Sequence, residues 1–271
     1  MERIEALKNI VNIFFFIVVA VITVLSYLQA RKTLFAPIRT ETFKLQLKAF
    51  EEILLYFQNK SESDFLNSFD LDKIVSLNAL RMADAYVSEF FPNEIKVDVD
   101  EREKLYSPLV GGIVSAEHMQ KYFEKVQPTD PAMPDQVASE PITNPAIVLA
   151  RWQEYEHALV EYTKEFNDQV RELEKLAASP ILPKSLRDMI GEFHNKAHKN
   201  LTLVGSVVGN FSREMPKQFP RAGDMRKFNP NGIWNDFNDQ RVQFEPEAKK
   251  ILESINAYLR IEDLMTGSPK P

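Results

Sequence analysis

An uncharged apolar stretch near the N-terminus, residues 10–28, constrains this sequence more than any other feature. Its side chains are mostly Ile, Val, Phe and Leu, and with its flanking residues it reaches the roughly 20 residues that a helix needs to cross a hydrocarbon core of about 30 Å. Asn12, Thr23 and Ser26 are tolerable there because their side chains can bond to neighbouring backbone or reach the interface. The sequence therefore predicts a single transmembrane helix within residues 1–30.

A cleaved signal peptide is the alternative interpretation of the same stretch. The apolar core of a signal peptide is usually about 7–15 residues long and follows a positively charged tip. Here the apolar run is longer, the residues before it carry balanced charges, and Arg31 and Lys32 follow it directly. We therefore expect an anchor that stays attached to the mature chain.

Lysine and arginine residues are more frequent after the apolar stretch than before it. Two of them precede the stretch, Arg3 and Lys8. Those that follow it within the next turns are Arg31, Lys32, Arg39, Lys44 and Lys48. Because cationic flanks stay on the cytoplasmic side, this bias predicts a single-pass protein of the cell's inner membrane. Its N-terminus would lie outside and its C-terminal domain in the cytoplasm.

Composition and charge exclude several classes of function for the rest of the chain. The 271 residues carry a formal net charge of −6, which argues against a nucleic-acid partner. The chain has no cysteine, so disulfide frameworks, thiolate metal sites and cysteine nucleophiles are all excluded. With 19 Phe and only 8 Gly, the composition favours helices with aromatic packing faces over a glycine-punctuated β-fold. We therefore expect an all-α fold.

Proline positions and apolar spacing divide the body into three regions. For residues 31–127 we predict a membrane-proximal helical region. We expect Pro37 to begin a second helix there, and an apolar seam to run from Phe43 to Phe57. This seam either pairs two copies of the chain or packs onto its own domain. Closely spaced prolines prevent helices and central strands in residues 128–144, which we interpret as a linker. Residues 145–271 predict a long helical hairpin followed by a C-terminal helix.

The hairpin prediction rests on two long apolar repeats. Asn144 suits an N-cap and Pro145 a first helical position, and a helix over residues 145–176 has an apolar face interrupted only by Gln169. A second repeat covers residues 186–215 after a short link, and short links join antiparallel helices. The predicted fold class is therefore all-α, with a single N-terminal transmembrane helix and a long antiparallel αα-hairpin.

Two pairs of glycines interrupt the helical pattern. Gly111 and Gly112 predict a break between helices. Gly205 and Gly209 fall within the second repeat, where glycine lowers helix propensity by about 1 kcal/mol per residue. They either permit close approach of another backbone segment or interrupt the helix.

His194 and His198 are the candidates for a metal site. They lie four residues apart on a predicted helix and so share a face, and two neutral imidazoles at that spacing can bind zinc, with Glu192 nearby. The glutamate base of the zinc-protease motif is missing between them, and Lys196 and Lys199 oppose a bound cation. We therefore interpret the pair as polar residues flanking the apolar seam, and we assign no catalytic residue, metal or cofactor.

A locally basic stretch lies near the C-terminal end of the hairpin. Residues 213–227 carry more cations than anions, and Phe219 and Phe228 lie within or beside them. Such a stretch could dock on anionic lipid, nucleic acid or an acidic partner. We expect an ordinary charged loop, paired with the acidic residues of 61–106.

The sequence as a whole favours interaction over catalysis. It contains no nucleophile elbow, phosphate-binding loop or dinucleotide fingerprint, and it identifies no small-molecule substrate. The first hypothesis is a membrane-anchored interaction or scaffold protein, whose partners are the lipid bilayer and either another protein or further copies of the chain. One alternative is an effector that oligomerises through its anchor and stalk and perturbs the bilayer. The other is a membrane-tethered metalloenzyme built on His194 and His198.

Overall fold

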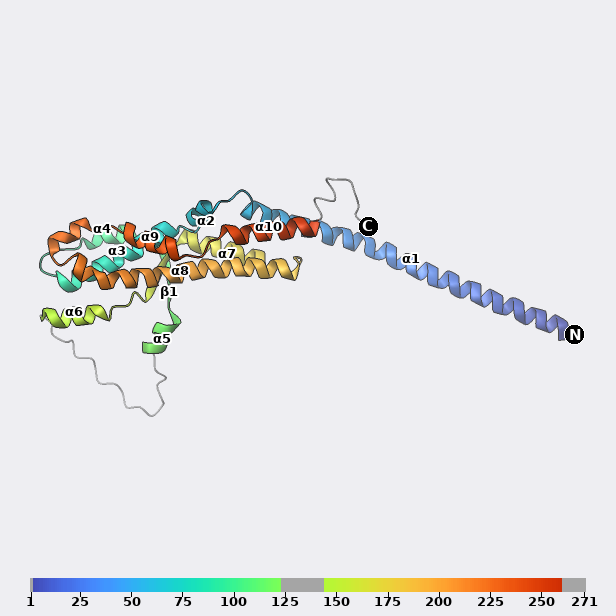
Figure 1. Cartoon of the computed structure of the whole chain (residues 1–271). Coiled ribbons are helices and arrows are strands. Elements are labelled where there is room, and N and C mark those ends of the chain that lie inside the picture. The colour runs from blue at the N-terminus through green and yellow to red at the C-terminus, as the bar shows by residue number, and fades with distance from the viewer. Residues whose placement is uncertain (1, 123–143, 260–271) are drawn as a thin grey trace, which may run out of the picture. The chain divides into compact units, whose positions relative to one another are not determined.

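The computed structural model describes residues 2–122 and 144–259, which form a mostly helical chain with one small sheet (Figure 1). The elements in chain order are α1 (Glu2–Phe57), α2 (Glu62–Ser68), α3 (Leu71–Phe90), α4 (Val99–Tyr106), β1 (Leu109–Val114), α5 (Ala116–Tyr122), α6 (Pro145–Gln153), β2 (Leu159–Thr163), α7 (Lys164–Ala178), α8 (Lys184–Gln218), η1 (Ala222–Lys227), α9 (Asn231–Gln240) and α10 (Glu245–Leu259). Most of the predicted linker lies outside the described residues.

The chain divides into two compact units. The first contains Met1–Tyr56 and Ser179–Pro183, and the second contains Phe57–Ala178 and Lys184–Pro271. The first unit is dominated by α1, whereas the second holds the sheet and the other helices.

Helix α1 runs without interruption through the apolar stretch and beyond it. The prediction that Pro37 begins a separate helix is wrong, because Pro37 lies inside α1. A proline inside a helix removes one backbone hydrogen bond. The residues on both sides include many good helix formers and no glycine, so the helix continues across it. In the described part of the chain, α1 is the one helix long and apolar enough to cross a membrane, and its apolar window is not buried at all.

The core of the second unit is built around Phe193 on α8. Its ring centroid lies 5.0 Å from that of Phe57, 5.2 Å from that of Phe65 and 5.3 Å from that of Phe244. Phe69 stacks on Phe244 at 5.0 Å, and all five side chains are buried. This aromatic cluster therefore joins the last residue of α1 to α2, α8 and the start of α10.

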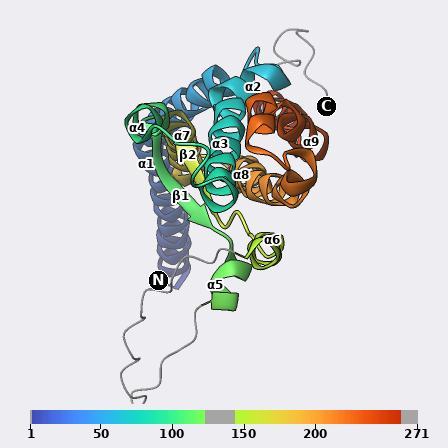
Figure 2. The ribbon, with the colours of Figure 1, turned by 90° about the vertical axis from the view of Figure 1, so that its left-hand side faces the viewer.

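A two-stranded antiparallel sheet replaces part of the predicted long helix. β1 and β2 pair with Gly111 opposite Tyr162 and Gly112 opposite Glu161, and Figure 2 shows the two strands side by side next to α3. The all-α prediction is therefore confirmed only as a mostly helical fold. The single helix expected over residues 145–176 is wrong, since this stretch forms α6, β2 and α7 in turn.

Two glycines of β1 make this strand pairing possible. A Cβ atom at Gly111 would lie 2.6 Å from the Tyr162 hydroxyl oxygen, and one at Gly112 would lie 2.7 Å from Cδ1 of Leu159. Side chains of β2 therefore lie across the bare backbone of β1. The helix break predicted at these glycines is a strand instead, because its partner is rich in β-branched and aromatic residues that favour extended backbone.

The predicted helical hairpin exists in shortened form, with α7 packed against α8. α8 covers the whole second repeat and passes through Gly205 and Gly209 without interruption. A Cβ atom at Gly205 would lie 2.7 Å from Cγ2 of Val160 and 3.1 Å from the carbonyl oxygen of His157. Of the two interpretations of these glycines, close backbone approach is the one that the structure confirms.

Sequence signals at several helix ends are also confirmed. Asn144 caps α6 by accepting a hydrogen bond from the Ala146 backbone nitrogen at 3.0 Å, with Pro145 in the first turn. The predicted C-terminal helix is α10, which begins at Glu245. The short helix α9 was not predicted, because Pro230 and the neighbouring Gly232 resemble a turn.

Glu62 fixes the start of α10. Its Oε2 accepts hydrogen bonds from the backbone nitrogens of Phe244 and Glu245, both at 2.8 Å, while its Oε1 forms an ion pair with Arg241. In return, Oε2 of Glu245 accepts a hydrogen bond from the backbone nitrogen of Glu62 at 3.2 Å. The N-terminal ends of α2 and α10 therefore satisfy each other's free N–H groups.

We expect Phe193→Ala to lower the free energy of unfolding by about 3–5 kcal/mol, because it opens a cavity at the centre of the aromatic cluster. Denaturant unfolding of the full chain in detergent, followed by the fluorescence of its 2 tryptophans, measures this change. Phe43→Ala is the matched control, since Phe43 is exposed, and it should stay within about 0.5 kcal/mol. A loss below about 1 kcal/mol for Phe193→Ala would contradict the central role of this ring.

We expect Glu62→Gln to cost about 2–3 kcal/mol of unfolding free energy, because hydrogen bonds to a charged group each contribute about 1.5–3 kcal/mol. The control is Glu101→Gln, which removes only an exposed ion pair with Lys104 and should cost at most about 1 kcal/mol. Both are measured by the same denaturant titration. Equal effects of the two substitutions would show that the Glu62 contacts do not hold α10.

Candidate functional site

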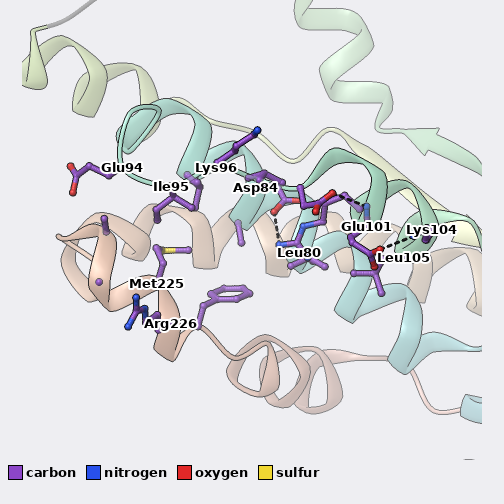
Figure 3. A pocket seen from close by; sticks show the side chains of 18 residues that line it. Leu80, Asp84, Glu94, Ile95, Lys96, Glu101, Lys104, Leu105, Met225 and Arg226 are labelled. Carbon is purple, nitrogen blue, oxygen red and sulfur yellow. Dashed lines mark hydrogen bonds and ion pairs between the residues drawn. The ribbon is translucent and has the colours of Figure 1, made fainter.

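A cavity of about 1050 Å³ lies in the second unit between α3, α4 and η1. We call it the α3–α4–η1 groove. Its walls are formed by the second half of α3, the segment 94–98, α4, and η1 together with Phe228 (Figure 3). This volume is at the upper end of the range of about 300–1000 Å³ that is usual for ligand-binding sites.

Apolar side chains from both walls line the interior of the groove. Ile95 from the α3–α4 side and Met225 from η1 lie on opposite sides of the gap in Figure 3, with Leu80 further along it. Phe228 closes the η1 side, where its ring packs against Phe219 at 5.9 Å. Apolar side chains from both walls therefore line the same cavity.

Three of the four acidic side chains of the groove are held by a neighbour, two of them in ion pairs. Asp84 forms an ion pair with Arg102 at 2.9 Å, and Glu101 forms one with Lys104 at 2.6 Å. Asp98 caps α4 by accepting a hydrogen bond from the Glu101 backbone nitrogen at 3.1 Å. These carboxylates therefore stabilise the walls of the groove.

Three charged residues of the groove lack such partners. Within residues 2–122 and 144–259, the side chains of Glu94, Lys96 and Arg226 form no ion pair or hydrogen bond to another side chain. All three are exposed. They are the charges that remain free to contact a ligand.

The α4 wall is fixed to α3 through Tyr106. Its hydroxyl donates to Asp84 at 2.6 Å, and the Arg81 guanidinium lies 3.7 Å from its ring centroid. Burial and the hydrogen bond to Asp84 raise the pKa of Tyr106 well above its usual value, so it stays a neutral donor. Arg81 also binds Glu161 of β2 at 2.8 Å, which links the groove wall to the sheet.

A second cavity of about 700 Å³ lies beside β1 and α8, and His157 is part of its lining. Nε2 of His157 lies 3.0 Å from Oδ1 of Asn78, and its Nδ1 lies 3.2 Å from the Tyr155 hydroxyl. Nδ2 of Asn78 donates to the carbonyl oxygens of Ile74 and Glu161, both at 2.8 Å, so Oδ1 is the acceptor. Nε2 of His157 therefore carries the hydrogen and Nδ1 accepts from Tyr155.

This hydrogen-bond chain keeps His157 neutral. Burial lowers the pKa of His157 to about 4 and raises the pKa of Tyr155 to about 12. Neither group titrates near neutral pH. Asn78 also accepts from the Glu161 backbone nitrogen at 3.0 Å, so the network fastens β2 to α3. Its role is structural.

Glu156 carries the charged side of the second cavity. It accepts from Lys121 at 2.7 Å and lies 3.1 Å from Nδ1 of His118. The hydrogen bonds from Lys121 and His118 lower the pKa of Glu156. These contacts join α5 to the segment that leads into β2.

His194 and His198, the predicted metal candidates, lie side by side on α8 with ring centroids 4.6 Å apart. Nε2 of His194 lies 3.5 Å from Oε1 of Glu174 on α7, and the ring of His198 meets Phe166 edge-on at 6.1 Å. Burial, and secondarily the neighbouring His194, lower the pKa of His198. Among the described residues, no group of three or more His, Cys, Asp or Glu side chains is placed to hold a metal ion. The absence of a metal stays a prediction.

Sequence reasoning did not find the groove or the His157 network. Asn78 and His157 are 79 residues apart, and Asp84 and Arg102 lie on two different helices, so no local spacing connects the members of either pair. The one available signal was the concentration of charges in residues 61–106 together with the basic stretch 213–227. The groove lies between parts of these two segments.

No protein-family model, curated protein or solved structure matches this chain. Its function is therefore inferred from the physical features of the two units.

We expect the free energy of unfolding to fall as the pH decreases, because His157 takes up a proton more readily in the unfolded chain. Its pKa is about 4 in the folded chain and about 6.5 when unfolded, so the unfolded state binds the proton first. The stability present above about pH 6.5 is then lost progressively down to pH 4, by up to about 3 kcal/mol at about 1.4 kcal/mol per unit. Denaturant unfolding at pH 7.5 and 4.5 measures the loss.

His157→Gln should remove most of this pH dependence, whereas His198→Gln, the matched control, should keep most of it. Both substitutions replace a buried or half-buried histidine with glutamine. If His157→Gln loses as much stability between the two pH values as the unsubstituted protein, the assignment of a neutral, buried His157 is wrong.

Proposed function

We propose that the chain is a membrane-anchored helical scaffold, which associates with further copies of itself through the α1 stalk, residues 29–48. The apolar stretch of α1 would lie in the inner membrane, with the N-terminus outside and the second unit in the cytoplasm. The observation that carries the proposal is an exposed apolar stripe on the stalk.

The stripe consists of Phe35, Ile38 and Leu45, whose exposed fractions are 49%, 60% and 56%. Thr42 lies between them in the sequence, and its hydroxyl donates to the Ile38 carbonyl oxygen at 2.9 Å. Positions 35, 38, 42 and 45 have the 3-4-3 spacing of a coiled-coil seam. This seam differs from the one suggested by Phe43–Phe57, of which only the C-terminal part is buried.

Charged residues lie beside the stripe and opposite it. At about 100° per residue, Lys44 and, just beyond the stalk, Glu51 fall on the face away from the stripe, whereas Glu41 and Lys48 lie beside Leu45 at its edge. Lys44 and Glu41 form an exposed ion pair at 2.8 Å. The stalk therefore carries an exposed apolar stripe with charged side chains beside it and opposite it. An amphipathic helix of this kind favours association in water.

Membrane insertion would strengthen such pairing. All copies insert in the same direction, so their stalks leave the bilayer parallel and in register. Confinement to one membrane raises the effective concentration of the stalks for each other. Inside the apolar stretch, the Thr23 hydroxyl donates to the Val19 carbonyl oxygen at 2.8 Å. This hydroxyl is used by its own helix, so the stalk carries more of the proposed association than polar groups within the membrane.

Disulfide crosslinking in native membranes tests the proposal, because the chain contains 0 cysteines and each introduced one is unique. We expect Ile38→Cys and Leu45→Cys to form disulfide-linked dimers on mild oxidation. Lys44→Cys and Glu51→Cys, on the charged face, are the matched controls and should crosslink several-fold less. Equal crosslinking on both faces, or none on the stripe, would rule out the proposed seam.

The same variants test the proposed topology. An impermeant maleimide added to intact cells should not label Lys44→Cys, whereas it should label this variant after the cells are opened. Labelling in intact cells would place the stalk outside and contradict the proposed orientation.

A further inference from the structure

We propose that α1 binds an anionic phospholipid in a cationic hollow directly after its apolar stretch. The headgroup phosphate lies among Arg31, Lys32 and Arg39, and the lipid's apolar part lies beside Leu28 and Phe35. The inference rests on the proposed insertion of α1 into the membrane, and it does not depend on association between stalks. It adds a ligand to the scaffold role, namely a lipid of the leaflet in which the stalk leaves the bilayer.

The hollow lies on one face of α1. It has a volume of about 320 Å³ and belongs entirely to the first unit. Its lining residues are Leu28, Arg31, Lys32, Phe35 and Arg39. At about 100° per residue, these five positions share a sector of about 100° of the helix circumference. Because one continuous helix carries them all, the side chains are grouped by the helix itself and not by the packing of distant segments.

The hollow carries three positive charges and no negative charge. Arg31, Lys32 and Arg39 are exposed, and across the described residues their side chains form no ion pair or hydrogen bond. The nearest acidic residue along the chain, Glu41, is already paired with Lys44 at 2.8 Å. Glu41 also lies about 130° around the helix from the centre of the hollow. An anion in the hollow therefore meets three uncompensated cations.

Helix geometry directs these cations toward the membrane surface. Arg31 and Lys32 follow Leu28 by about 5 and 6 Å along the axis, at 1.5 Å per residue. This distance falls within a headgroup layer that is about 5–8 Å thick. Side chains of a helix tilt toward its N-terminus, which in α1 is the direction of the apolar stretch. Arg39 lies about two turns beyond Arg31, and it lines the same hollow because its side chain points back along the helix.

The position of the hollow favours a lipid over other anions. It begins at Leu28, the last residue of the apolar stretch, and Phe35 lies among its cations. Both side chains are about half exposed, at 52% and 49%. A ligand that fills the hollow therefore presents apolar surface at one end and negative charge at the other, as a phospholipid does. Cationic segments beside a membrane attract anionic headgroups. A second copy of the chain would instead bring three further cations, which repel the first three.

The hollow and the stripe of the stalk use different flanks of Phe35. Lys32 lies about 60° to one side of Phe35, whereas Ile38 and Leu45 lie about 60° and 80° to the other side. Arg31 lies about 40° to the side of the stripe, where the same residue of a paired copy would approach it. A phosphate bound in the hollow offsets this repulsion. Lipid binding is therefore compatible with association of the stalks.

Native mass spectrometry of the full chain tests the proposal. The chain is reconstituted in nanodiscs with equal amounts of palmitoyl-oleoyl phosphatidylglycerol and phosphatidylcholine, and the lipids that stay bound on release are identified. The two lipids share their acyl chains, so a difference between them reports the headgroup. We expect phosphatidylglycerol to be enriched several-fold over phosphatidylcholine, and the enrichment to weaken at high salt.

A variant with rearranged cations separates the hollow from a general attraction to the membrane. Lys32→Thr with Thr33→Lys, and Arg39→Thr with Thr40→Arg, keep the composition and net charge but move two cations by about 100° around the helix. We expect the enrichment to fall several-fold. The matched control is Lys32→Arg with Arg39→Lys, which exchanges the two cations within the hollow and should keep the enrichment.

Carbonate washing of the membranes verifies that each chain is inserted. A parent chain that is washed away would contradict the proposed function and this inference together. A parent chain that stays inserted but retains both lipids equally overturns this inference alone. Enrichment that the inserted, rearranged variant keeps in full does the same, because the attraction would then not need the hollow. Displacement of phosphatidylglycerol by soluble glycerol phosphate would assign the hollow to a free phosphate ester instead of a lipid.

Discussion

The packing around Phe193 is the interaction on which the second unit depends. Its ring contacts aromatic residues from α1, α2 and the start of α10, which are brought together from both ends of the chain. Large aromatic side chains bury much apolar surface per residue, so a small set of them can organise several helices. Phe57 belongs to this core and is also the last residue of α1.

Polar side chains then fix the orientation of helices and strands, which apolar packing alone does not determine. Glu62 holds the start of α10, and Asn78 fastens β2 to α3 through His157 and the backbone of Glu161. Glu62 and Asn78 are each buried or half-buried, and each uses nearly all the hydrogen-bonding capacity of its side chain. Such contacts determine the orientation of elements that aromatic packing alone would allow to slide. The groove walls are held in the same way, by Asp84, Arg102 and Tyr106.

Long periodic segments were predictable from the sequence, whereas short elements and distant contacts were not. The repeat of α8 and the capping signal of Asn144 are local, so they indicated the correct helices. β2 is only 5 residues long and lies inside a pattern with helical spacing, and its partner β1 contains two glycines. Strand pairing overrode that pattern because Gly111 and Gly112 leave space for the side chains of β2. The groove could not be predicted, since its walls come from segments more than a hundred residues apart along the chain.

In the proposed scaffold, the apolar helix anchors the stalk and the second unit to the membrane. Counting copies of the full chain per particle tests it most directly, by photobleaching steps of a labelled chain in native-membrane nanodiscs. The account predicts particles with two or more copies, reduced to single copies by Ile38→Asp combined with Leu45→Asp on the exposed stripe. Single copies at every expression level, or a chain recovered outside the discs, would contradict it.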